Sequence, residues 1–141
     1  MFRVMRNVLA CMGCVVTIAC LQGCSTKAET EQNVNQALQQ KYIDMYNVTL
    51  PKAEEGDRYS QYLMATMYHN GQGVEYNINK AAYWYKKSAD QGNMISQTRL
   101  GIMYYLGRGV KKNTKKALIL LNQAKEQGSI EAIQVIEKLT Q

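Results

Sequence analysis

Cysteine and histidine, which supply many nucleophiles, bases and metal ligands, are confined to few positions in this chain of 141 residues. All four cysteines lie at or before position 24, and His69 is the single histidine. One histidine excludes a His-x3-His metal pair, and the region after Cys24 holds no thiolate nucleophile or thiolate metal site. We therefore expect no catalytic residue, no metal site and no cofactor, and we interpret His69 as a polar cap at a helix end.

Two other groups of residues could do chemistry, but simpler explanations suit both. Glu54, Glu55 and Asp57 are clustered acids that are typical of a solvated turn near a helix junction. The pairs Gly71-x-Gly73 and Gly107-x-Gly109 lack the third glycine, the lysine and the preceding strand of a phosphate-binding loop. We interpret these glycines as turn residues.

The formal net charge of +6 would by itself suggest an acidic partner. Its one dense cluster is Lys111, Lys112, Lys115 and Lys116, which suits a solvated helix start. Lipid head groups or an acidic protein are the alternative partners of this cluster.

The first 23 residues predict a secretory signal that does not belong to the fold. Arg3 and Arg6 form a short positive segment, and the almost uniformly apolar run Val8–Leu21 follows it. Fourteen residues are too few for a comfortable membrane span. No acid occurs before Glu29.

The end of this signal resembles the bacterial lipobox, in Leu21-Gln22-Gly23-Cys24. The resemblance implies that Cys24 becomes the N-terminus and carries acyl chains such as palmitate, which anchor the protein in a membrane. Ile18-Ala19-Cys20 is a weaker competing site, and an ordinary signal peptide that contains cysteines is the alternative. Ser25 after the cysteine implies an outer-membrane lipoprotein, whose repeats we expect to face the periplasm. That location argues against nucleic acid as a partner.

The region beyond the signal contains one stretch twice, at an offset of thirty-six residues, in Ser60–Gly92 and Ser96–Gly128. A fixed period in this range is typical of a helical solenoid. In the first copy, apolar or small residues at spacings of three and four predict a helix that ends at the two glycines. Asn77 or Asn79 then caps a second helix, which stops at Gly92.

The repeated pattern, with Tyr68, Gly71, Gly73, Ala81 and Gly92 at fixed spacing, resembles the Sel1-like repeat, a relative of the tetratricopeptide repeat. This resemblance implies an all-α fold, a short right-handed α-solenoid of helical hairpins with about two full repeats plus capping helices. In the second copy Leu120 and Leu121 replace the aromatic pair and Lys125 replaces a small residue, so its second helix follows the family less closely. We expect these segments in order: signal 1–23, tether 24–31, N-terminal capping helix and partial repeat 32–56, repeats 57–92 and 93–128, and C-terminal capping helix 129–141.

The N-terminal capping helix is expected from about Gln32 to Tyr46, outside the 36-residue register. Pro51 interrupts the chain after it and opens a short helix, Pro51–Glu55, at which the register resumes. At the other end, Ser129 is expected to cap the last helix, which packs on the second hairpin.

A second stripe of residues runs beside the packing face of each first helix. In helical-hairpin solenoids the first helices line the concave surface, so we expect these residues to form a shallow groove. Tyrosine suits recognition there, although a wider packing stripe explains the same pattern. Tyr83, Trp84 and Tyr85 are assigned instead to packing between hairpins. The candidate partner-binding residues are Tyr59, Tyr62, Thr66, His69, Ile95, Thr98, Ile102 and Tyr105.

Three classes of function fit these observations. The resemblance to Sel1-like proteins implies a lipid-anchored module that binds a protein or peptide in the envelope, and a sharper version is an immunity protein that neutralises an antibacterial effector. The second class is an assembly or pilotin-like factor for an envelope complex. The third class is a cell-wall-acting enzyme. Against it, the chain lacks the cysteines of the Sel1-like proteins linked with penicillin binding, and its sequence shows no pair of nucleophile and base. The sequence does not set the oligomeric state.

Overall fold

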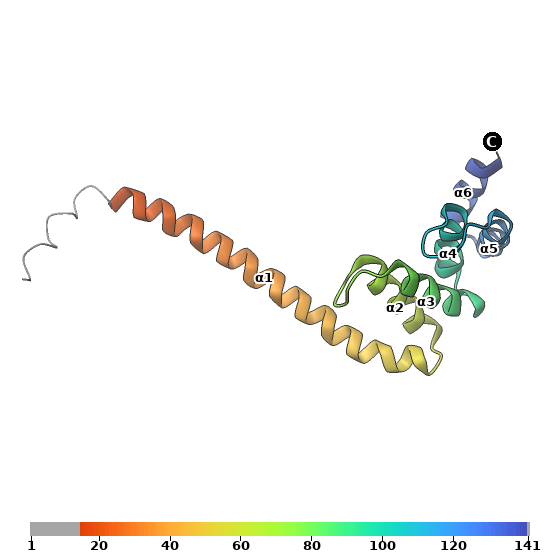
Figure 1. The fold of residues 1–141 in the computed structure, drawn as a ribbon, viewed down its shortest axis with the longest axis horizontal. Helices are drawn as coiled ribbons and strands as arrows, with labels where there is room; N and C mark the ends of the chain where they lie inside the picture. The colour runs from red at the N-terminus through yellow and green to blue at the C-terminus, as the bar shows by residue number, and fades with distance from the viewer. Residues whose placement is uncertain (1–14, 141) are drawn as a thin grey trace, which may run out of the picture. The chain divides into compact units, whose positions relative to one another are not determined.

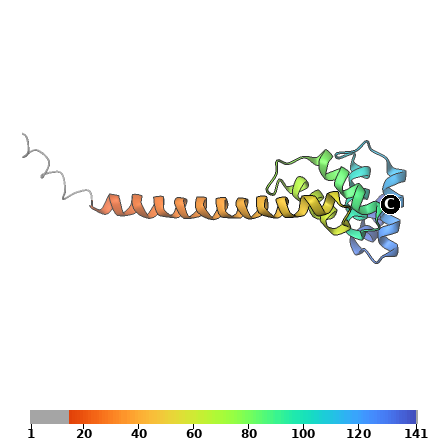
Figure 2. The same cartoon turned by 90° about the horizontal axis from the view of Figure 1, so that it is seen from below.

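The computed structural model describes residues 15–140, with side chains from Thr30 to Leu139. Within that range the chain forms six helices and no strand, which confirms the all-α solenoid of helical hairpins (Figures 1 and 2). The helices are α1 (Val15–Glu54), α2 (Arg58–Asn70), α3 (Ile78–Asp90), α4 (Met94–Leu106), α5 (Thr114–Glu126) and α6 (Ile130–Thr140).

The chain divides into two units, Met1–Leu38 and Gln39–Gln141. The described part of the first unit is helical throughout and belongs to α1. The second unit contains the end of α1 and all of the hairpin repeats. Residues 1–14 of the expected signal lie outside the described range, and no helix within that range is both long and apolar enough to cross a membrane.

Helix α1 differs from the expected N-terminal segments. The helix includes residues 24–31, for which we expected a tether, and it continues through Pro51, where we expected a break. Between Cys24 and Leu50 the sequence has no glycine or proline, and its Ala, Glu, Gln and Lys residues favour helix. Pro51 lies three residues before the end of α1, and its ring nitrogen donates no hydrogen bond to the preceding turn. The Pro51 carbonyl accepts a hydrogen bond from the Glu55 amide at 2.9 Å.

The end of α1 also corrects the expected register. Tyr42–Glu54 stands exactly one period before α3, so this part of α1 takes the place of the second helix of an earlier repeat. Thr49 and Ala53 are buried at the positions that Tyr85 and Ala89 occupy one repeat later. Thr49 stands where the next repeat has an aromatic residue. The position is therefore buried in both repeats although the residue type differs.

Side-chain caps begin the helices of both hairpins. Asp57 and Asn93 accept hydrogen bonds from the backbone amides three residues later, at 2.6 and 2.8 Å. The predicted cap Asn77 does the same for α3 at 2.9 Å, and Asn113 does so for α5. The predicted cap of the last helix is also confirmed, because Ser129 Oγ accepts from the Ala132 amide at 3.2 Å.

The glycine loops between paired helices pack against backbone. At Gly73, with φ of +70°, an added Cβ would lie 2.5 Å from the carbonyl carbon of Tyr42 in α1. At Gly109, with φ of +69°, it would lie 2.4 Å from the carbonyl oxygen of Ile78 at the start of α3. Each loop therefore contacts the second helix of the preceding repeat at the same register position, Tyr42 or Ile78.

Buried glutamines join successive repeats by hydrogen bonds. Gln61 Nε2 donates to the Ala53 carbonyl at 3.1 Å, and Gln61 Oε1 accepts from Gln91 Nε2 at 2.7 Å. The second repeat has the same arrangement in Gln97, Ala89 and Gln127. Since a buried amide without partners is costly, these bonds fix the spacing of the hairpins.

The second hairpin packs tightly despite its departures from the family pattern. Leu121 is fully buried at the position of Tyr85, and Leu120 is partly buried at the position of Trp84. Gly101 makes room for the leucine, because an added Cβ there would lie 2.8 Å from Leu121 Cγ. Lys125, which replaces a small residue, is exposed.

Candidate functional site

The described face of the first helices carries a row of aromatic rings. Ring centroids lie 6.0 Å apart for Tyr59 and Tyr62, 6.4 Å for Tyr62 and Tyr85, and 6.4 Å for Tyr85 and His69. Tyr59 is 61% exposed, whereas Tyr85 is buried and forms the floor of the row. These contacts join the tyrosines predicted on α2 to His69 through the buried ring of Tyr85, which comes from α3.

A pocket of about 150 Å³ lies beside this row, between the two repeats. This volume is smaller than that of a site for a drug-sized ligand. It therefore suits a single side chain. The pocket is lined by His69, Ile78, Tyr85, Arg99, Ile102, Met103, Leu106 and Arg108.

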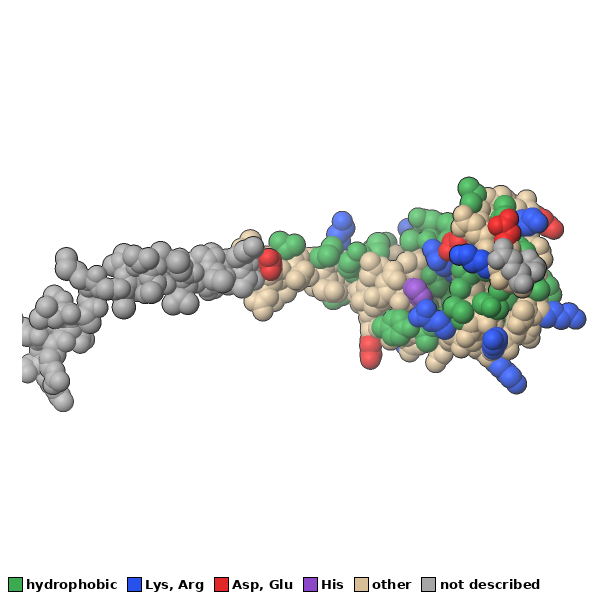
Figure 3. Space-filling model, turned by 90° about the horizontal axis from the view of Figure 1, so that it is seen from above, with side chains coloured by type: hydrophobic (Ala, Val, Ile, Leu, Met, Phe, Trp, Pro, Cys, Tyr) green, Lys and Arg blue, Asp and Glu red, His purple; other side chains and the backbone are tan. Residues whose placement is uncertain are grey.

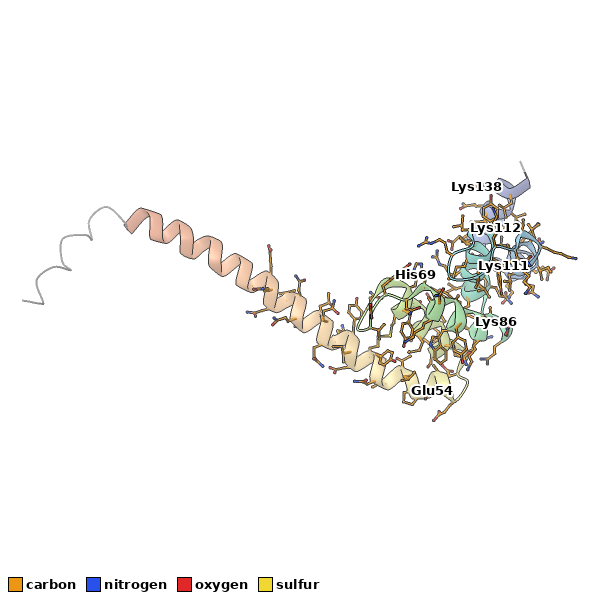
Figure 4. The ribbon with its side chains drawn as sticks, viewed as in Figure 1. Glu54, His69, Lys86, Lys111, Lys112 and Lys138 are labelled. Atoms are coloured by element: carbon orange, nitrogen blue, oxygen red, sulfur yellow. The ribbon has the colours of Figure 1, made fainter. Side chains whose placement is uncertain are left out.

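Cationic side chains and an apolar wall meet in this pocket. Arg99 and Arg108 are exposed, and Leu106 is 52% exposed beside them. Figure 3 shows the chain's single histidine, in purple, beside a blue cationic side chain and green hydrophobic ones. Figure 4 labels His69 at the end of α2, the helix that supplies one wall of the pocket.

Three interactions involve the polar groups of this pocket. Arg99 Nη1 lies 3.0 Å from Glu131 Oε1 of α6, in an ion pair that is half exposed. His69 Nδ1 is 3.1 Å from Asn70 Oδ1, which leaves the Nε2 atom for another partner. Burial raises the pKa of Tyr85, partly opposed by its hydrogen bond with Thr66, so the phenol is neutral.

The structure brings some of the eight predicted groove residues together and separates others. Among those assigned to a shared groove, His69 and Ile102 line the same pocket. Tyr105 is instead covered by Lys112, whose Nζ lies 5.6 Å from the ring centroid. Ile95 is 42% exposed, and the partly buried Thr66 directs its hydroxyl to the Tyr62 carbonyl at 3.0 Å.

Thr98 does not lie on the surface, contrary to its assignment to the groove. It is 1% exposed, and its hydroxyl lies 3.0 Å from Ser129 Oγ, just before α6. The Thr98 hydroxyl also donates to the Met94 carbonyl at 3.0 Å. The segment that begins α6 covers Thr98, so a partner cannot reach this residue.

Sequence reasoning missed six of the eight residues that line the pocket, namely Ile78, Tyr85, Arg99, Met103, Leu106 and Arg108. Ile95, Arg99, Ile102 and Leu106 follow one another at spacings of four, three and four, so a broader helical stripe would have included the arginine and the leucine. Tyr85 was assigned to packing, and its burial agrees with that, but its ring also forms the pocket floor. Arg108 follows a glycine in a loop, where no periodicity points to it.

The arrangement is suited to binding. Within the described part of the chain no cluster of His, Cys, Asp and Glu side chains could hold a metal ion. The pocket presents hydrogen-bond donors and apolar atoms around a space for one side chain, next to an exposed aromatic surface. Such combinations of aromatic and arginine residues are typical of protein-recognition surfaces.

Both repeats match the profile of a known protein family. A profile of the Sel1 repeat matches residues 58–93 and 95–129, which together make up half of the chain. The chain belongs to the Sel1 repeat family. Sel1 repeats generally mediate protein–protein interactions and typically act without enzymatic activity, so the family indicates an interaction module. No curated protein sequence matches this Sel1 repeat chain.

Solved structures of similar chains share the fold. A Sel1 repeat protein from Oxalobacter formigenes is 39% identical with a TM-score of 0.61, over 62% of this chain and 25% of its own. The protective antigen c5321 of uropathogenic Escherichia coli, which displays an SLR fold, is 36% identical with a TM-score of 0.63, over 64% and 20%. Cysteine-rich protein B of Helicobacter pylori is 26% identical with a TM-score of 0.61, over 65% and 69%. The present chain therefore matches only a quarter or less of the first two proteins.

Proposed function

We propose that this Sel1 repeat protein is a lipid-anchored module of the bacterial envelope that binds a protein partner through the aromatic row and the adjoining pocket. The observation that carries the proposal is the continuity of Tyr59, Tyr62, Tyr85 and His69 with a pocket shared by two repeats. Large aromatic side chains with few rotatable bonds supply contact area at a small entropic cost, which favours recognition over catalysis.

The anchor is proposed from the lipobox-like end at Cys24. Acyl chains on this cysteine would keep the repeats at the membrane surface, because several chains bury far more methylene groups than the single chain that binds only marginally. Mass spectrometry of the membrane-extracted protein tests this step. The expected result is an N-terminal Cys24 with the mass of acyl chains, and loss of this mass and of membrane fractionation in Cys24→Ala.

Protein binding is tested by capture of partners from crosslinked cell envelopes with the full chain. The test variant combines Tyr59→Ala and Leu106→Ala, which are 61% and 52% exposed. A matched control combines Tyr83→Ala and Ile119→Ala, which are 53% and 52% exposed on the second helices. Exposed side chains of this kind contribute little to the core, so both variants should fold, which far-UV circular dichroism checks.

Proteins retained by the wild type and the control but lost from the test variant are the expected result. The same set of proteins from all three forms would refute the assignment of this face. The identity of the partner then separates the two roles, since an antibacterial effector indicates an immunity protein and a component of an envelope machine indicates an assembly factor.

A further inference from the structure

The second repeat is unusually cationic. Between residues 91 and 125 the sequence has seven lysines and arginines and no acid, whereas the equivalent stretch 55–89 has four cations and three acids. Within the described structure two of these seven, Arg99 and Arg108, line the pocket, and four others form the exposed lysine cluster before and at the start of α5. Figure 4 labels Lys111 and Lys112 in this cluster. A field of one sign attracts ligands of the opposite charge.

We propose that the pocket between the repeats binds the carboxylate of a glutamate or aspartate in an acidic segment of a partner protein. This inference rests on the proposed protein-binding function and names the chemistry of its partner. Two observations support it. Two cations line the pocket, and the surrounding repeat, 93–128, has seven cations with Glu126 as its single acid.

The lining matches a carboxylate at the end of an aliphatic stem. Ile78, Ile102 and Leu106 supply an apolar wall for methylene groups, and the guanidinium of Arg108 supplies paired N–H donors. The volume of about 150 Å³ fits one such side chain. A flat membrane surface could contact exposed lysines but could not place a head group beside the buried rings of this pocket.

One of the two pocket arginines already pairs with a carboxylate of the chain, from a residue that does not itself line the pocket. Glu131 of α6 lies 3.0 Å from Arg99, so one of the two guanidiniums is paired from within the fold. Arg108 takes part in neither of the two ion pairs found among the described residues. Its side chain is exposed on the loop after α4, so its guanidinium has no ion-pair partner among the described residues to give up when it binds an incoming carboxylate.

The test measures binding of rhodamine-labelled hexaglutamate by fluorescence anisotropy, with hexaglutamine as the uncharged probe. The detergent-solubilised full chain is compared with Arg108→Gln and with Lys115→Gln, which removes an equal charge from the same repeat outside the pocket. We expect the unaltered chain to bind hexaglutamate and not hexaglutamine. Arg108→Gln should weaken binding about tenfold or more, the effect of one charge-assisted hydrogen bond, and Lys115→Gln only about twofold.

Three results would overturn the inference. Equal losses in the two variants would mean that the general field, and not the pocket, attracts the peptide. Equal binding of hexaglutamate and hexaglutamine would exclude recognition of carboxylates. Displacement of the peptide by phosphatidylglycerol vesicles but not by phosphatidylcholine vesicles, with no effect of Arg108→Gln, would indicate a membrane-facing cationic surface.

The capture experiment keeps this inference distinct from the proposed function. Suppose that partners are captured through Tyr59 and Leu106 but that Arg108→Gln does not change the binding of hexaglutamate. The chain would then be a protein-binding module without a carboxylate pocket. The same set of proteins captured by wild type, control and test variant, together with a tenfold effect of Arg108→Gln on hexaglutamate, would leave an anion pocket and refute the protein-binding role of the aromatic row.

Discussion

Replacement of either glycine in the first glycine loop by alanine tests how α1 packs on the repeats. Gly71 and Gly73 have φ angles of +68° and +70°, so alanine meets nearly the same backbone strain at both positions. At Gly71 the nearest atom to an added Cβ is 3.5 Å away, an ordinary contact, whereas at Gly73 it is the Tyr42 carbonyl carbon at 2.5 Å. The pair of variants therefore separates steric contact with α1 from the strain of a left-handed residue.

The expected magnitudes follow from these distances. A left-handed alanine costs about 1–2 kcal/mol at either site. At Gly73 the loop and α1 must also separate by about 0.9 Å to relax the contact from 2.5 to 3.4 Å, and overpacking of this kind costs about 1–3 kcal/mol more. With a urea dependence of about 1–3 kcal/mol per molar, Gly73→Ala should unfold at roughly 1 M less urea than Gly71→Ala.

Urea unfolding of the full chain, followed by far-UV circular dichroism, measures both midpoints under one condition. Tryptophan fluorescence provides a second probe, because Trp84 is the single tryptophan and is buried in α3. Equal midpoints for the two variants would refute the packing of the loop against Tyr42. They would also remove the main evidence that the end of α1 acts as the second helix of an earlier repeat.

Two further variants test the polar contacts within the repeats. Gln97→Ala leaves the Ala89 carbonyl without its buried donor, so thermal unfolding should show a loss of about 1–3 kcal/mol, while the exposed control Gln123→Ala should change little. Equal effects would contradict the buried glutamine bond. The hydrogen bonds from Ser60 lower the pKa of Asp57 below its usual 3.8, so this cap stabilises the fold fully above pH 3.8 and less as the pH falls through the lowered value. Asp57→Asn should reduce that acid-dependent fall in the melting temperature, and an unchanged pH profile would exclude the contribution of this group.

The repeat architecture could be predicted from sequence because its signals are backbone requirements. Gly71, Gly73 and Gly107 stand where the backbone has a positive φ angle, which favours glycine. Asn77 caps the start of a helix, where backbone amides have no partner within the helix. The same residue types therefore recur wherever the same geometry recurs. Of the earlier copy, only the end from Pro51 was predicted, because the rest of its second helix shares few residue types with α3. Val48 stands where Trp84 stands one repeat later, and it is 62% exposed while the tryptophan is 7% exposed.

The pocket could be predicted only in part. Helical spacing placed Ile102 on the face of its helix that lines the pocket. The fact that His69 and Arg108 line this same pocket depends on how α2, α3 and α4 are stacked. Burial of Thr98 depends likewise on the start of α6, which lies about thirty residues away along the chain. Spacing within one helix reports which residues share a face, and it carries no information about which neighbour covers that face.

The packing of each glycine loop on a main-chain carbonyl has a consequence for how such chains change their length. The atoms met by Gly73 and Gly109 include backbone atoms of Tyr42 and Ile78, which every amino acid possesses. The closest approach at both junctions is to a main-chain atom, with the Ile78 side chain somewhat further away at 3.1 Å, so a junction of this kind depends more on the backbone than on the receiving side chain. Duplication or loss of one 36-residue segment would therefore join compatible surfaces without compensating substitutions, so repeat number can vary in evolution faster than the residues of the core.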